Sequence, residues 1–215
     1  MKKTIISCVL FLTAVTAFSQ TPMKTAAEAK LSASDLAVKI ADRILATTTY
    51  EFKNTKTGKT YKSVKNLPVD MNVKVACKYN NWHYTNGVTH IALMELADKT
   101  GAKKYDDYVL KNMNFVFNEG NLDFFKKQYE QAMKNEGWYG VRKLSWHMIF
   151  RGKRLDDNGP MGASLIDLQM KHPNNSFLNY INETAEHLNY GEPRLADGTI
   201  ARIWPHENTI WADDA

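Results

Sequence analysis

The chain has 215 residues, with 28 Lys and Arg against 23 Asp and Glu, a formal net charge of +5. Setting aside an N-terminal leader leaves roughly 195 residues, enough for one domain with a sizeable core. The remaining charge is modest and no basic patch is interleaved with aromatic residues, so we expect no nucleic-acid partner. Cys77 is the one cysteine after the leader, which excludes an intrachain disulfide. Without a zinc-like spacing of ligands, we expect no metal and no cofactor.

The first twenty residues have the three regions of a secretory signal peptide. Residues 1–3 are basic, residues 5–15 form an apolar run, and Ala17 and Ser19 are small residues at a cleavage spacing. The run is shorter than the roughly 20 residues needed to span a membrane. We therefore expect residues 1–20 to be removed, and residues 21–215 to work without a membrane in a Gram-negative periplasm, with export beyond it as the alternative.

The chain after the leader reads as helical. Residues 21–31 are a polar lead-in, and Ser34 is predicted to cap a first helix. That helix has apolar residues at helical spacing, namely Leu36, Ile40, Ile44 and Leu45. Residues 53–66 are polar and rich in turn-forming residues, which predicts a loop.

Five more helices are predicted along the rest of the chain. They cover residues 85–100, 104–118, 122–135, 159–170 and 176–189. The first is expected to bury Val88, Ile91, Ala92 and Leu96 and to end at Gly101 as its C-cap residue. The second should bury Tyr105, Tyr108, Val109, Met113 and Val116. Residues 136–156 look aromatic and irregular, and no stretch shows sustained strand alternation, so the fold class is all-α.

An internal repeat relates two of the predicted helix pairs. The segment from Ile91 matches the segment from Ala163 at a constant offset of 72 residues, so that Leu93 corresponds to Leu165 and Tyr105 to Phe177. Each unit is a helical hairpin, which cannot bury its apolar face alone and must stack on neighbours. A solenoid or a closed ring of hairpins would satisfy this pattern equally.

Four short clusters contain the residues suited to chemistry. Trp82, His83 and Tyr84 could form an aromatic platform for a sugar, or could pack into the core at a helix entrance. Asp156 and Asp157 precede a helix, where carboxylates are commonly caps. Arg202 could pair with a carboxylate or be solvated. The fourth cluster, which contains Trp211 and Asp213, ends the chain.

The order of these clusters resembles glycoside hydrolase families 88 and 105, the unsaturated glucuronyl and rhamnogalacturonyl hydrolases. The order is WHY, LDD-x-G-x-MGA, DGT-x-AR and W-x-DD, and it extends from about Trp82 to Ala215. The resemblance implies an (α/α)6 barrel of six helical hairpins, which agrees with the repeat. Two departures are Asn158-Gly159-Pro160 after LDD and the end of the chain soon after W-x-DD, from which we expect about the first half of the ring and an inactive fragment of a larger enzyme.

The resemblance also implies a reaction and roles for these residues. Asp213 would be the acid and base that hydrates the double bond of a terminal Δ4,5-unsaturated uronic acid. Asp157, with Asp156 as the near alternative, would be the second carboxylate. Substrate contacts would come from the aromatic and basic residues of the motifs, namely Trp82, His83, Tyr84, Arg202 and Trp211, and the partner would be an acidic unsaturated oligosaccharide.

Two other functions compete with this hydrolase. The chain could be a non-catalytic carbohydrate-binding module, or another α/α-barrel enzyme such as a polysaccharide lyase. A lyase would use a Tyr/His or Arg-centred base, so the paired Asp residues favour the hydrolase. The residues do not distinguish a rhamnogalacturonan substrate from a glycosaminoglycan one.

Overall fold

The computed structural model describes residues 32–117, 120–151, 155–202 and 206–210. The chain divides into two compact units, residues 1–37 and 38–215, and the account below concerns the second unit except where α1 begins. The predicted signal peptide therefore lies outside the described residues. Within the described ranges, no helix has both the length and the apolar character required to cross a membrane.

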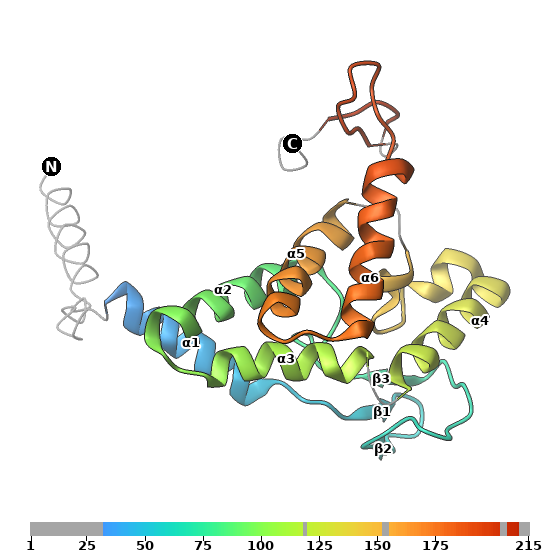
Figure 1. Cartoon of the computed structure of the whole chain (residues 1–215). Coiled ribbons are helices and arrows are strands. Elements are labelled where there is room, and N and C mark those ends of the chain that lie inside the picture. Colours follow the sequence, from blue (N-terminus) through green and yellow to red (C-terminus); the bar gives the residue numbers. More distant parts are fainter. Residues whose placement is uncertain (1–31, 118–119, 152–154, 203–205, 211–215) are drawn as a thin grey trace, which may run out of the picture. The chain divides into compact units, whose positions relative to one another are not determined.

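Helices make up most of the structure, with one small sheet near the start of the second unit (Figure 1). The elements in chain order are α1 (Ala33–Thr47), β1 (Phe52–Asn54), β2 (Thr60–Tyr61), β3 (Val73–Val75), α2 (Tyr84–Thr100), α3 (Lys104–Phe117), α4 (Asn121–Val141), the 3-10 helix η1 (His147–Phe150), α5 (Leu155–Lys171), α6 (Asn175–Glu186) and the π-helical turn η2 (His187–Gly191). The predicted all-α class is confirmed.

The two predicted hairpins are present as α2–α3 and α5–α6. Leu93 and its counterpart Leu165 are both buried, as are Tyr105 and Phe177. Gly101 ends α2 in the left-handed conformation with φ of 69°, and its N–H donates to the carbonyl of Ala97. The repeat in the sequence therefore corresponds to a repeat of packed helix pairs.

Helices α2 and α5 pack side by side and in parallel. Near their starts, a Cβ atom on Gly87 would lie 2.4 Å from the carbonyl carbon of Pro160 and 2.5 Å from the nitrogen of Met161. Near their ends, the Lys171 ammonium donates to Asp98 at 2.7 Å. Because contacts join start to start and end to end, the N-termini of both helices lie at the same end of the pair.

The core joins the sheet to the helices through aromatic side chains. Phe52 of β1 stacks on Phe115 of α3 with ring centroids 5.3 Å apart, and Phe125 of α4 stacks on Trp146 at 6.1 Å. The sheet has the antiparallel order β2-β1-β3, and Phe52 pairs with Val75 on its buried face. One face of the sheet therefore packs inward, and the other faces solvent.

Several local predictions were wrong. Ser32, not Ser34, caps α1, because the Ser32 hydroxyl accepts from the Asp35 N–H at 3.1 Å. Val88 and Ala92 are exposed and Ile91 and Leu96 are only partly buried, since α2 turns Gly87 and His90 toward its neighbours instead. Residues 53–66 contain parts of two strands, because β1 and β2 pair across the predicted loop.

The later helix boundaries also differ from prediction. Helix α4 continues to Val141 past a kink at Gly137, whose φ is 58°, and so extends into the region expected to be irregular. Helix α5 begins at Leu155, four residues before the predicted start, so Pro160 falls within the helix rather than in its first turn. The Asp pair thus belongs to the first turn of α5.

Substituting Gly87 by Ala tests the α2–α5 contact. The new methyl group would overlap the α5 backbone, which cannot rotate away as a side chain can, so we expect a loss of about 3 kcal/mol in the free energy of unfolding. Urea denaturation measures the loss. Gly159→Ala in α5 is the matched control, because no atom lies within 4 Å of its Cβ position. Equal stability of the two variants would contradict the close contact.

His90 makes stability depend on pH. It is fully buried, both ring nitrogens lack a hydrogen-bond partner among the described residues, and burial lowers its pKa from 6.5 to about 4. Because the folded state favours the neutral imidazole, the free energy of unfolding is unaffected by His90 above pH 6.5. It decreases as the pH falls toward 4, by roughly 3 kcal/mol in total. Thermal denaturation across this range should show the loss, and His90→Leu should abolish most of it while His172→Gln leaves it. A steep loss that persists in His90→Leu would contradict this assignment.

Candidate active site

The N-terminus of α2 carries two of the predicted aromatic contacts. The His83 side chain caps the helix, since its Nδ1 accepts from the Thr85 N–H at 3.4 Å and lies 2.9 Å from the Thr85 hydroxyl. The ring of Tyr84 lies against that of His83, with centroids 4.7 Å apart, and Tyr84 is 46% exposed. His83 is therefore used for capping, and Tyr84 remains accessible to a ligand.

Trp82 does not contribute to a surface platform, so that part of the prediction was wrong. Its side chain is completely buried and meets Tyr180 edge-on, with ring centroids 4.9 Å apart. Trp146 and Phe117 complete its aromatic surroundings. The alternative of a tryptophan packed at a helix entrance is correct, because Trp82 fills the space between α3, α6 and the segment before η1.

An ion pair joins two motifs that are 46 residues apart. The guanidinium of Arg202 donates to Oδ1 of Asp156 at 2.7 Å. The Arg202 side chain is only 15% exposed and that of Asp156 34%. Asp156 stands in the first turn of α5, and the Arg202 backbone is held by its N–H bond to the Thr209 carbonyl at 2.8 Å. Asp156, one of the two possible carboxylates, therefore contacts Arg202.

The turn before Arg202 is built by its own polar residues. Asp197 accepts from the Thr199 N–H at 2.9 Å, and this hydrogen bond lowers the pKa of the Asp197 carboxyl below its ordinary value. Gly198 has φ of 91°, a left-handed conformation that favours glycine. The Arg194 guanidinium donates to the Gly198 carbonyl at 2.9 Å. Asp197 therefore shapes the turn and is not a candidate acid or base.

The shared end of α2 and α5 carries charges of both signs. A helix N-terminus has a partial positive charge, and the contact of Gly87 with Pro160 holds the two termini together. Arg202 adds a positive charge on the α5 side, and Asp156 in the first turn of α5 pairs with it and offsets that charge. Tyr84 is exposed at the start of α2.

Three predicted residues cannot be placed in this arrangement. Trp211 and Asp213 lie outside the described residues, and Asp157 belongs to α5 but its side chain is not described. Within the described part of the chain, no group of three His, Cys, Asp or Glu side chains could hold a metal ion. The described site thus consists of Tyr84, Asp156 and Arg202.

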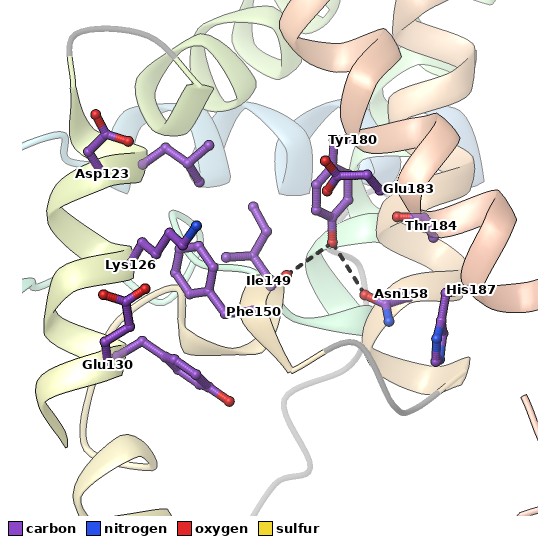
Figure 2. A pocket seen from close by; sticks show the side chains of 12 residues that line it. Asp123, Lys126, Glu130, Ile149, Phe150, Asn158, Tyr180, Glu183, Thr184 and His187 are labelled. Atoms are coloured by element: carbon purple, nitrogen blue, oxygen red, sulfur yellow. Dashed lines mark hydrogen bonds between the residues drawn. The ribbon is translucent and has the colours of Figure 1, made fainter. Parts of the chain in front are cut away.

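A separate cavity of about 560 Å³ lies between α4 and α6 (Figure 2). Tyr180 lines the cavity, and its hydroxyl donates to the Asn158 amide oxygen at 3.3 Å and to the Ile149 carbonyl at 3.4 Å. Its described lining contains none of the predicted site residues. Only Asn158 of its lining belongs to one of the predicted motifs, and the other lining residues come from elements that are distant in the sequence. We assign the site to the Arg202–Asp156 pair, since that pair joins two of the predicted motifs.

The fold is a set of packed helical hairpins, and the α2–α3 and α5–α6 pairs follow the repeat in the sequence. The chain belongs to Glycosyl Hydrolase Family 88, whose family model matches residues 54–215. The match includes all four motifs and confirms the resemblance. No curated protein matches the chain.

A double-mutant cycle on Arg202→Gln and Asp156→Asn measures the ion pair. Because both side chains are more than half-buried, we expect a coupling of about 1 kcal/mol in the free energy of unfolding. The control is Lys143 with Glu136, 2.9 Å apart but with both side chains about half exposed, where about 0.3 kcal/mol is expected. A coupling for Arg202 with Asp156 no larger than that of the control pair would argue against a built site.

Proposed function

We propose that this glycoside hydrolase removes a terminal Δ4,5-unsaturated uronic acid from pectin-derived oligosaccharides of the rhamnogalacturonan type. The observation that carries the proposal is the Arg202–Asp156 ion pair at the shared N-terminal end of α2 and α5. An unsaturated uronate carries its carboxylate on C5, one of the two carbons of its double bond. The two helix ends and Arg202 would bind that carboxylate, and the double bond would then lie within reach of the site carboxylates.

In the proposed reaction, Asp213 donates its proton to C4 of the double bond. A water molecule adds its oxygen to C5, and its released proton returns to the Asp213 carboxylate. The resulting hemiketal opens by breaking the bond between C5 and the ring oxygen, which forms a ketone at C5 and leaves C1 as a hemiacetal. That hemiacetal then breaks down to an aldehyde and releases the rest of the oligosaccharide as an alcohol. Asp213 must hold a proton near neutral pH, which a second carboxylate close by would promote by repulsion.

Asp157 is the proposed second carboxylate, and Asp156 is the alternative. The pairing of Asp156 with Arg202 supports this division, because an Asp neutralised by an arginine is poorly suited to raise the pKa of a neighbouring acid. In this scheme Asp156 orients Arg202 toward the sugar carboxylate. Tyr84, exposed at the start of α2, would contact the sugar ring, and Trp211 would form a wall of the site.

Asp213→Asn, introduced into a form of the chain extended to a full ring of hairpins, tests the acid and base directly. The amide cannot donate the proton, so we expect turnover to fall at least about 100-fold while the dissociation constant for substrate stays within about threefold. The near-ultraviolet absorbance of an unsaturated rhamnogalacturonan disaccharide disappears on hydration and reports turnover, and calorimetry reports binding. Asp214→Asn is the matched control and should keep most of the activity.

Three outcomes distinguish the competing functions. Full turnover by Asp213→Asn would rule out its role as acid and base. Faster turnover of an unsaturated glycosaminoglycan disaccharide would retain the mechanism and change the substrate. Binding without hydration of either disaccharide by the unsubstituted protein would favour the carbohydrate-binding module.

A further inference from the structure

The net charge of the whole chain is modest, but residues 51–78 are strongly basic. Residues 51–78 contain seven lysines, Lys53, Lys56, Lys59, Lys62, Lys65, Lys74 and Lys78, against Glu51 and Asp70. The first five recur at every third position. The excess of five positive charges here exceeds the excess of three on all of residues 21–215, so the remainder of that region is net negative. The charge is therefore concentrated in one part of the fold.

This segment forms the small sheet and its turns (Figure 1). Along β1, Phe52 and Asn54 are buried whereas Lys53 is exposed, and along β3, Val73 and Val75 are buried around Lys74. Lys53 and Lys74 are direct cross-strand partners, so their side chains project from the same outer face. Six of the seven lysines are exposed and Lys74 is half-buried.

The arrangement of these lysines is unfavourable for folding alone. Like charges directly opposite each other on neighbouring strands repel. Within this fully described segment, none of the seven ammonium groups forms an ion pair with a carboxylate. Asp70 is already engaged, because it accepts hydrogen bonds from Asn54 and Asn72 that tie β1 to the β3 side. The outer face therefore has unneutralised positive charge that an external anion would stabilise.

Two of the lysines are held against tyrosine rings at the margins of the sheet. The Lys59 ammonium lies 5.1 Å from the centroid of the Tyr61 ring, and the Lys78 ammonium lies 4.9 Å from that of Tyr79. These contacts reduce the number of conformations that each long side chain samples. Less conformational entropy is therefore lost when a ligand binds.

We propose that the outer face of the β2-β1-β3 sheet, centred on Lys53 and Lys74, binds an anionic polysaccharide rich in uronic acids. The inference rests on the proposed function, which takes its oligosaccharide from such a polymer. A polyuronate carries one carboxylate per acidic sugar along an extended chain, which matches a row of point charges. Residues 51–78 contain no arginine, so this face offers lysine point charges without the two-pronged contacts of a guanidinium. The choice of a polyuronate over another polyanion follows from the proposed function.

Binding of de-esterified polygalacturonate tests the proposal. The double variant Lys53→Gln with Lys74→Gln should bind about tenfold or more weakly than the unsubstituted protein in low salt. High salt should abolish binding, and fully methyl-esterified pectin, which lacks the charge, should not bind. Lys99→Gln with Lys134→Gln is the matched control, since it removes two exposed lysines from α2 and α4 and should change the affinity less than twofold.

A stability measurement separates a binding role from a structural one. Lys53→Glu replaces the repulsive cross-strand pair by an attractive one, so its Tm should rise by about 1–3 °C while polygalacturonate binding falls. A fall in Tm together with weaker binding would mean that Lys53 is needed for folding and would overturn the proposal. Unchanged binding by the Lys53 and Lys74 variants would also overturn it.

Other anionic partners are tested in the same assay. Tighter binding of single-stranded poly(dA) or of phosphatidylserine vesicles than of polygalacturonate, at equal charge, would overturn the choice of polysaccharide. The test is independent of turnover. If the polymer binds through the lysines but no disaccharide is hydrated, the surface is supported and the proposed reaction is rejected. If a disaccharide is hydrated but the polymer does not bind through the lysines, the reaction is supported and the surface is rejected.

Discussion

The close approach of Gly87 to the backbone of Pro160 and Met161 is the contact on which the arrangement of the site depends. With no side chain at that position, the starts of α2 and α5 can lie against each other, and the Lys171–Asp98 ion pair joins their far ends. This parallel packing brings two positive helix ends together. It also sets the start of α2, with Tyr84, beside the first turn of α5, with Asp156.

Around this pair of helices, polar side chains divide into those that build the structure and those available to a ligand. His83 caps α2 and Asp197 shapes a turn, so both titratable side chains accept hydrogen bonds from backbone N–H groups. Trp82 fills the core. Tyr84 and Arg202 remain near the shared helix end, and the segment that carries Arg202 is anchored by the Thr209 carbonyl. The site is thus supplied by three chain segments held in place by backbone hydrogen bonds and packing.

Positively charged side chains lie at two places in this molecule, and we propose that the two places bind ligands of different size. At the helix ends, Arg202 is held by Asp156, and we propose that it contacts the carboxylate of a single sugar. On the sheet, lysines spread over an outer face and repel one another, an arrangement suited to an extended polymer with regularly spaced charges. The hydrolysis that we propose at the first site would act on pieces of the polymer that we propose for the second.

The sequence by itself determined the all-α class, the hairpin repeat at an offset of 72 residues, the Gly101 cap and the family, because helix spacing, capping and motif order are local properties of the chain. Only the tertiary structure decided that Trp82 is buried, that Asp156 is the partner of Arg202, and that short strands pair across residues 53–66. Those outcomes depend on contacts between segments that lie far apart in the chain or pair only in the fold.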